Sequence, residues 1–198
     1  DLRGRAYLYY GGPVVNNSAD VIFTGESSTN SFGRGLCGAG DVDGDGFADI
    51  VIGAQSYASS KGKAYVYLGG TAMNNTADAV VNGEGTNNFF GFSVAGGGDM
   101  NGDGYKDFMV GAYGVNTNKG RVYVYKNSIS GTDISDVKML GTSQSNFGLS
   151  ATAAGDLNGD GYDDYIVGAP SYGDFATGRA YIFFGSQSPD TIPDITIN

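Results

Sequence analysis

The sequence predicts an all-β fold built from repeated four-stranded units, and three observations support this prediction. Glycine accounts for 35 of the 198 residues and proline for only 4, so glycine-based turns are expected and proline-rich linkers are not. Tyr, Phe, Val and Ile dominate the apolar residues, and these residue types favour strands. No segment carries capped apolar residues at i, i+3, i+4 and i+7, so we expect almost no helix.

An internal repeat of about 58 residues organises the chain. Asp41, Asp99 and Asp156 begin equivalent loops that lie 58 and 57 residues apart. A second marker, Gly-Arg/Lys-Ala/Val-Tyr, recurs every 58 residues and begins at Gly4, Gly62, Gly120 and Gly178. A repeat of this length with several strands in each copy is typical of a β-propeller blade.

One period divides into four predicted strands. The first covers residues 90–98, and the loop 99–107 connects it to the second at 108–112. A turn at 118–120 precedes the third strand at 122–125, and the polar stretch 128–135 precedes the fourth at 137–140. Alternating apolar residues between such turns are typical of antiparallel strands, so each unit is expected to be a four-stranded meander.

The repeat divides the chain into three full blades and a half blade. Residues 1–27 supply strands three and four of one blade, and full blades follow at 28–85, 86–142 and 143–198, giving 14 strands. Closed propellers hold four to eight blades, so this chain is not expected to close alone. We expect a piece of a longer propeller or half of an assembly. Two copies would both contribute strands three and four, which favours the longer propeller.

Three aspartate-rich loops predict three calcium sites. Each loop has Asp or Asn at positions 1, 3, 5 and 9, and glycines at positions 4 and 6 that permit positive φ. Calcium binds six to eight oxygen atoms, so the backbone carbonyl at position 7 is a further candidate. The candidate ligands are Asp41, Asp43, Asp45, Phe47 and Asp49, then Asp99, Asn101, Asp103, Tyr105 and Asp107, then Asp156, Asn158, Asp160, Tyr162 and Asp164. Position 8 varies among Ala48, Lys106 and Asp163, as expected for a side chain that points out of its loop.

Two other interpretations of these loops are an EF-hand and ordinary Asp-Gly hairpin turns. The EF-hand is excluded, because its glutamate at position 12 is replaced by Ile52, Val110 and Val167. Ordinary Asp-Gly hairpin turns are the remaining alternative, which three matching copies disfavour. The crowded carboxylates would repel one another without metal, so calcium is expected to stabilise the fold without itself contacting a partner.

Composition and charge exclude several functions. The net charge of −10 argues against nucleic-acid binding, and no apolar run approaches the roughly 20 residues of a membrane span. The chain has no His, and Glu26, Glu84, Asp174 and Asp190 form no apparent pattern, so we expect no enzyme. The G-x-G-x-x-G match at 33–38 lacks a following helix. Cys37 is the one cysteine and is expected to be a buried thiol.

The chain resembles the FG-GAP repeat of integrin α-subunit propellers and their bacterial and archaeal relatives. The first half of the motif is Phe32-Gly33, Phe90-Gly91 and Phe147-Gly148, and the second half is Ile52-Gly53-Ala54, Val110-Gly111-Ala112 and Val167-Gly168-Ala169-Pro170. Gln55 and Tyr113 replace the final proline in the first two copies. The resemblance implies a seven-bladed propeller outside the cell, with the metals on one face and a role in adhesion.

We therefore expect a secreted or cell-surface, non-catalytic segment that binds a protein or glycan. One alternative is a subunit of a surface fibre or layer assembled through open blade edges. Another is the non-catalytic part of a larger secreted enzyme. Exposed aromatic residues could stack on sugars, but the recurring Tyr7, Tyr65, Tyr123 and Tyr181 are expected to serve packing. Asn16 and Asn74 begin candidate glycosylation sequons.

Overall fold

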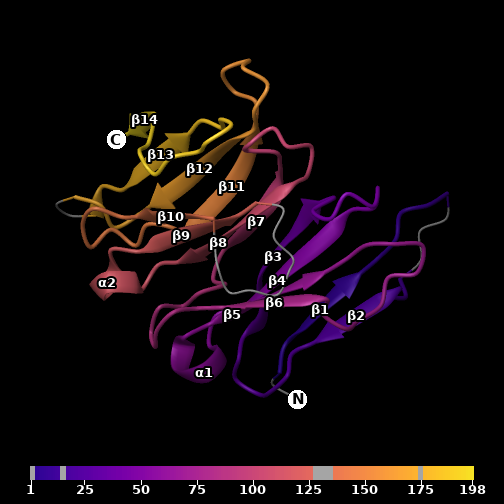
Figure 1. Cartoon of the computed structure of the whole chain (residues 1–198). Coiled ribbons are helices and arrows are strands. Elements are labelled where there is room, and N and C mark those ends of the chain that lie inside the picture. Colours follow the sequence, from indigo (N-terminus) through magenta and orange to yellow (C-terminus); the bar gives the residue numbers. More distant parts are fainter. Residues whose placement is uncertain (1–2, 14–16, 127–135, 174–175) are drawn as a thin grey trace.

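A computed structural model of the chain describes residues 3–13, 17–126, 136–173 and 176–198. Within these ranges, 14 strands form four antiparallel sheets (Figure 1). The first sheet has two strands, β1 (Arg5–Leu8) and β2 (Val21–Thr24). The second contains β3 (Phe32–Gly40), β4 (Asp49–Ala54), β5 (Lys63–Tyr67) and β6 (Ala79–Asn82). The third contains β7 (Val94–Gly98), β8 (Asp107–Ala112), β9 (Arg121–Tyr125) and β10 (Val137–Leu140). The fourth contains β11 (Ser150–Gly155), β12 (Asp164–Ala169), β13 (Arg179–Phe183) and β14 (Ile195–Ile197).

These sheets confirm the predicted all-β fold of four-stranded meanders. In each full sheet the strands pair in chain order, as they do in a propeller blade. The predicted strand 90–98 is shorter than expected, because Gly91 has a φ of 84° and Phe90 instead makes an isolated bridge to Gly62 of the preceding sheet.

Two short elements are turns and not regular helices. They are α1 (Tyr57–Ser60) and α2 (Val115–Asn118). Ala58 and Ser59 inside α1 have φ of 48° and 58°, and α2 contains similar left-handed residues. A regular helix requires negative φ throughout, so the described residues agree with the expectation of almost no helix. No helix among them is long and apolar enough to cross a membrane.

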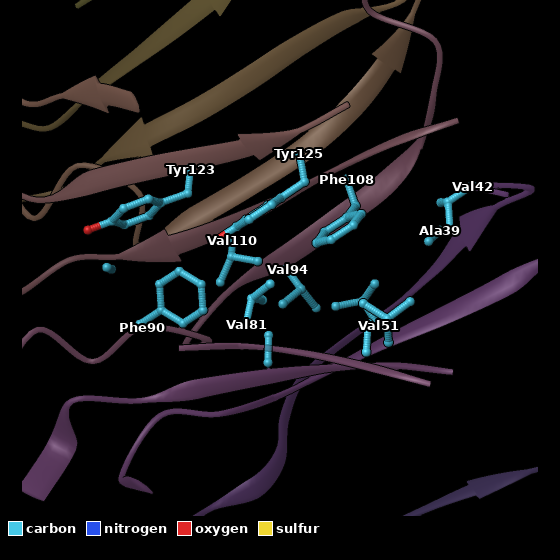
Figure 2. Close-up of a cluster of buried hydrophobic side chains, with 14 of the residues drawn as sticks. Ala39, Val42, Val51, Val81, Phe90, Val94, Phe108, Val110, Tyr123 and Tyr125 are labelled. Atoms are coloured by element: carbon cyan, nitrogen blue, oxygen red, sulfur yellow. The ribbon is translucent and has the colours of Figure 1, made fainter. Parts of the chain in front are cut away.

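The sheets follow one another along the chain, with their first strands side by side. In Figure 1 the elements succeed one another from β1 and β2 to β14, and the inner strands β3, β7 and β11 lie next to each other. Apolar side chains fill the space between successive sheets. Figure 2 shows one such cluster, in which Val51 and Val81 of the second sheet face Val94 and Phe108 of the third, with Phe90 from the segment before β7 beside them.

The glycines of the two motif halves allow neighbouring sheets to approach backbone to backbone. A Cβ atom at Gly53 would overlap the carbonyl oxygen of Gly91, and one at Gly111 would overlap that of Gly148. Each pair joins the second half of one motif copy to the first half of the next. Glycine is therefore required at these strand positions by the packing of one sheet on another.

The recurring tyrosines are buried in three of the four repeats. Tyr65, Tyr123 and Tyr181 are buried, whereas Tyr7 is 51% exposed. The expectation of one packing role is therefore wrong for Tyr7. In the full sheets the motif phenylalanine covers this tyrosine, and the two-stranded sheet contains no such phenylalanine.

Two acidic residues that appeared unpatterned have equivalent roles. Glu26 pairs with Lys63, and Glu84 pairs with Arg121 and Lys138. In both cases the glutamate precedes a sheet and reaches the first residue of that sheet's third strand, 37 positions later. The expectation of no pattern is thus wrong for this pair. Asp174 lies outside the described residues.

Candidate metal centres

The three candidate loops occupy the same place in their sheets. Residues 41–49, 99–107 and 156–164 connect the first strand of a full sheet to its second. The position-9 aspartates Asp49, Asp107 and Asp164 begin these second strands and are buried. Three residues further on, the residues in place of the EF-hand glutamate are buried within β4, β8 and β12. This placement agrees with the exclusion of the EF-hand.

Each loop curls around the carboxylate at position 1. Oδ1 of Asp41 accepts backbone N–H bonds from Gly44 at 2.6 Å and Asp45 at 3.1 Å, and Oδ2 accepts one from Gly46 at 2.8 Å. Asp99 and Asp156 accept the equivalent three bonds in their loops. Hydrogen bonds from Gly161 and its neighbours lower the pKa of Asp156. The position-1 carboxylates are therefore oriented inward by the backbone.

The glycines at positions 4 and 6 have the predicted positive φ in all three loops. The values are 81° and 90° at Gly44 and Gly46, and 72° and 91° at Gly102 and Gly104. Gly159 and Gly161 have 79° and 94°. Residues with a Cβ adopt this conformation at a cost, so the glycines allow successive N–H groups to turn toward one carboxylate.

The position-9 carboxylate ties the end of each loop to its beginning. Oδ2 accepts the N–H of position 2 at 2.7 Å in Asp49, 2.8 Å in Asp107 and 2.7 Å in Asp164. Burial is the main cause that raises the pKa of Asp107 to about 7, and the carboxylates of Asp103 and Asp99 add to it. Burial, followed by repulsion from Asp43 and Asp45, also outweighs the hydrogen bonds at Asp49 and raises its pKa.

The first loop brings three candidate carboxylates close together. Oxygen atoms of Asp41, Asp43 and Asp49 all lie within 4.8 Å of one another. Oδ1 of Asp107 is buried without a hydrogen-bond partner among the described residues. Calcium is a hard cation that binds grouped carboxylate oxygens, and its positive charge would offset their mutual repulsion. The residues therefore fit the ion.

Positions 3 and 5 differ between the loops. Asn101 donates Nδ2–H to Oδ2 of Asp103 at 2.9 Å, and Asn158 does the same to Asp160 at 2.9 Å. In the first loop Asp43 replaces this amide, so no such bond forms between positions 3 and 5. At position 5, Oδ1 of Asp45 accepts the N–H of Phe47 at 2.8 Å. The ligand roles of all five positions stay predictions.

The loops also contact one another, which the sequence did not predict. The rings of Tyr105 and Tyr162 lie against Gly44 and Gly102 of the preceding loops. The N–H of Lys106 donates to the carbonyl of Asp41 at 2.9 Å. Position 8 does point out of its own loop, but at Lys106 and Asp163 it reaches the neighbouring loop. The sequence signal was its charge in two of three copies.

Comparison with known families agrees with this geometry. Residues 99–167 match the FG-GAP-like repeat, and residues 32–67 match the FG-GAP repeat. This chain is an FG-GAP repeat protein. The matches cover the loops 41–49, 99–107 and 156–164, and they include Gly53, Gly111 and Gly148 among the glycines that join the sheets.

The FG-GAP chain is similar to integrin α subunits. Integrin alpha-8 of Mus musculus is 32% identical over 195 residues, and the match covers 89% of this chain and 18% of that protein. Integrin alpha-6 of Homo sapiens is 35% identical over 155 residues, and the match covers 76% of this chain and 13% of that protein. Integrin alpha-5 of Xenopus laevis is 35% identical over 120 residues, and the match covers 58% of this chain and 11% of that protein. The chain thus spans less than a fifth of the length of these relatives.

Proposed function

We propose that this chain is a calcium-stabilised, non-catalytic part of an extracellular propeller that serves adhesion by binding a protein or glycan. The observation that carries the proposal is the threefold recurrence of one loop geometry, with Asp41, Asp43 and Asp49 gathered within 4.8 Å. The similarity to integrin α subunits supports an adhesion role. The seven-bladed ring implied by the FG-GAP resemblance, and the blade limits at 27, 85 and 142, belong to the same proposal.

Calcium would be held by positions 1, 3, 5, 7 and 9 of each loop. When bound, it supplies positive charge that offsets repulsion among the carboxylates. The chain itself supplies the order of the loop: backbone N–H groups fix the position-1 carboxylate, and position 9 anchors the loop on the sheet. Extracellular calcium modules bind with Kd of about 10⁻⁴ to 10⁻³ M, which suits an extracellular chain.

A non-catalytic role is supported by how the acidic residues are used. The loop aspartates orient the backbone, and Glu26 and Glu84 form ion pairs between sheets. The chain has no His, the commonest residue for proton transfer. A catalytic unit elsewhere in a longer protein is compatible with this proposal.

Assembly through an open strand edge is a second candidate. β5, β9 and β13 pair with strands on both sides, whereas β1 pairs only with β2 among the described strands. Beside β1 lies an apolar cavity of about 250 Å³, lined by residues that include Tyr7, Phe23, Leu36 and Ile52. In the other sheets the equivalent edge, that of β5, β9 or β13, pairs with a strand of the sequence Asp-x-x-x-Gly-Ala. Such a strand, from further blades of the same protein or from a partner, would complete the half blade.

Asn74 is the described candidate for glycosylation. It is exposed in the β5–β6 connection, and its Oδ1 accepts the N–H of Thr76 at 2.7 Å. Asn16 lies outside the described residues. Mass spectrometry of the chain secreted from a glycosylating host, with Asn74→Gln as control, tests this assignment.

Thermal unfolding with calcium and with chelator tests the main proposal. We expect chelator to lower the melting temperature strongly, and magnesium to restore little of it. A variant with Asn at position 5 of every loop, carrying Asp45→Asn, Asp103→Asn and Asp160→Asn, should no longer respond to calcium. An unchanged melting temperature in the unsubstituted chain would mean that the loops are ordinary turns.

Light scattering in the same samples separates a defined oligomer, expected for self-assembly, from a monomer, expected for part of a longer propeller.

A further inference from the structure

The second and third loops are joined by a pair of hydrogen bonds at one residue. The N–H of Asp163 donates to the carbonyl oxygen of Asp99 at 3.0 Å, and Oδ2 of Asp163 accepts the N–H of Asp99 at 2.7 Å. The same carboxylate accepts a weaker bond from Nζ of Lys106 at 3.4 Å. Asp163 therefore fixes both backbone groups of the residue that begins the second loop, on either side of its candidate ligand carboxylate.

The first and second loops are joined less completely. The N–H of Lys106 donates to the carbonyl oxygen of Asp41 at 2.9 Å, which matches one of the two bonds made by Asp163. The side chain of Lys106 has no acceptor for the N–H of Asp41, and its aliphatic part lies against Gly40. Asp163, and not Lys106, therefore bonds through its side chain to the first residue of the preceding loop.

One of the two bonded residues, Asp99, is itself a candidate ligand, and the other, Asp163, lies next to two candidate ligands of its own loop. Asp163 stands between Tyr162 and Asp164, which are positions 7 and 9 of the third loop. The ring of Tyr162 also lies against Gly102 at position 4 of the second loop. Ordering the third loop thus fixes a ring and two hydrogen bonds on the second loop. A shared set of ordered groups is a physical basis for coupling two sites.

We propose that Asp163 couples the two loops, so that calcium binding at 156–164 raises the calcium affinity of 99–107. The inference rests on the proposed function, because it requires that both loops bind calcium. Asp163 is a positioning residue: its side chain contacts the other loop's backbone and is not itself among the candidate ligands. By thermodynamic reciprocity, the second loop raises the affinity of the third by the same factor. The first loop is coupled more weakly, because it receives one hydrogen bond where the second receives two.

Calcium titration of the full chain, followed by NMR at the amides of the position-6 glycines, tests the coupling. Gly46, Gly104 and Gly161 report the three loops separately. We expect Asp160→Asn, which weakens the third loop, to lower the calcium affinity of the second loop about fivefold or more, the lower end of typical couplings. In an Asp163→Ala background the same substitution should leave the second loop nearly unaffected. Asp45→Asn, the matching position-5 substitution in the first loop, should change the second loop less than Asp160→Asn does.

Charge alone must be separated from coupling, since Asp163→Ala also removes a negative charge near the second loop. Asp190→Ala provides the matched control, because Asp190 is exposed and lies outside all three loops. Asp160→Asn should retain its full effect on the second loop in the Asp190→Ala background. An equal effect with and without Asp163 would overturn the coupling while leaving calcium binding intact. Absence of any calcium response at the three glycines would overturn the proposed function as well.

Discussion

The ring of Phe90 packs edge-to-face on the ring of Tyr123, with centroids 5.1 Å apart and an interplanar angle of 72°. Phe32 with Tyr65 and Phe147 with Tyr181 repeat this geometry at 5.4 Å and 5.5 Å. The phenylalanine begins the FG-GAP motif, and the tyrosine lies on the third strand. The pair therefore packs the first residue of the FG-GAP motif against the third strand of the same blade.

This packing predicts unequal costs for the same substitution at two repeat positions. Tyr123→Ala should lower the free energy of unfolding by about 3–5 kcal/mol, because it leaves a cavity beside Phe90. Tyr7→Ala should lower it by less than about 1 kcal/mol, since Tyr7 is 51% exposed. Urea denaturation in calcium measures both. Equal losses at the two positions would contradict the different burial.

The motif glycines predict a second contrast. Gly53→Ala should cost about 3 kcal/mol or more, because the added methyl group would overlap the carbonyl of Gly91 and force the sheets apart. Gly38→Ala is the matched control within β3, where a Cβ would meet nothing within 4 Å. It should change stability by less than about 0.5 kcal/mol. Denaturation curves compare them, and a tolerated Gly53→Ala would argue against close packing of these blades.

Repetition made the blades and loops predictable from the sequence. Turn residues at fixed intervals and alternating apolar residues located the four strands of each unit, and three copies of the loop made the positive φ of Gly44 and Gly46 an expectation. The strand 90–98 was predicted too long, because the bridge of Phe90 to the preceding blade depends on tertiary packing.

Contacts between repeats were the part that the sequence did not reveal. Lys63 and Glu26 are 37 residues apart, so their pairing appears only when one blade is placed beside the next. The same holds for Asp163 and Asp99, which are 64 residues apart. Tyr7 was predicted to be buried because its repeat position matches Tyr65, but burial depends on a covering phenylalanine and not on the repeat position alone.

The ion pairs between blades predict a stabilising substitution at Thr142. Glu26 and Glu84 each reach a cation 37 residues later, and Thr142 stands at the equivalent position before Arg179. Nε of Arg179 is buried without a hydrogen-bond partner among the described residues. Thr142→Glu should raise stability by about 0.5–1 kcal/mol, and high salt should reduce the gain. Thr142→Gln is the uncharged control, and an equal effect of both would exclude an ion pair.

The environment of Cys37 predicts that its thiol reacts slowly with alkylating agents. Cys37 is half-buried and packs against the core, which partly agrees with the expected buried thiol, and burial raises its pKa to about 12. Since the thiolate is the reactive form, alkylation at pH 8 should be slower than that of a cysteine peptide by roughly a hundredfold or more. Iodoacetamide labelling followed by mass spectrometry measures the rate. Urea should restore rapid labelling, and fast reaction of the folded chain would contradict the burial.

The amide at position 3 predicts how calcium affinity can be raised in the second loop. Asn101 donates a hydrogen bond to Asp103 at 2.9 Å, whereas the first loop has Asp43 at this position. Asn101→Asp replaces that bond with carboxylate repulsion and adds one charged ligand. The melting temperature in chelator should therefore fall, while calcium affinity at the second loop should rise by roughly tenfold, or about 1.4 kcal/mol.

Calorimetric titration of Asn101→Asp, with chelator and calcium melting curves on the same sample, checks both halves of this prediction. Gln144→Glu is the charge control, because Gln144 is exposed in the β10–β11 connection outside the loops. It should leave both melting temperatures nearly unchanged. A fall in stability with no gain in calcium affinity would mean that position 3 orders the loop without binding the ion.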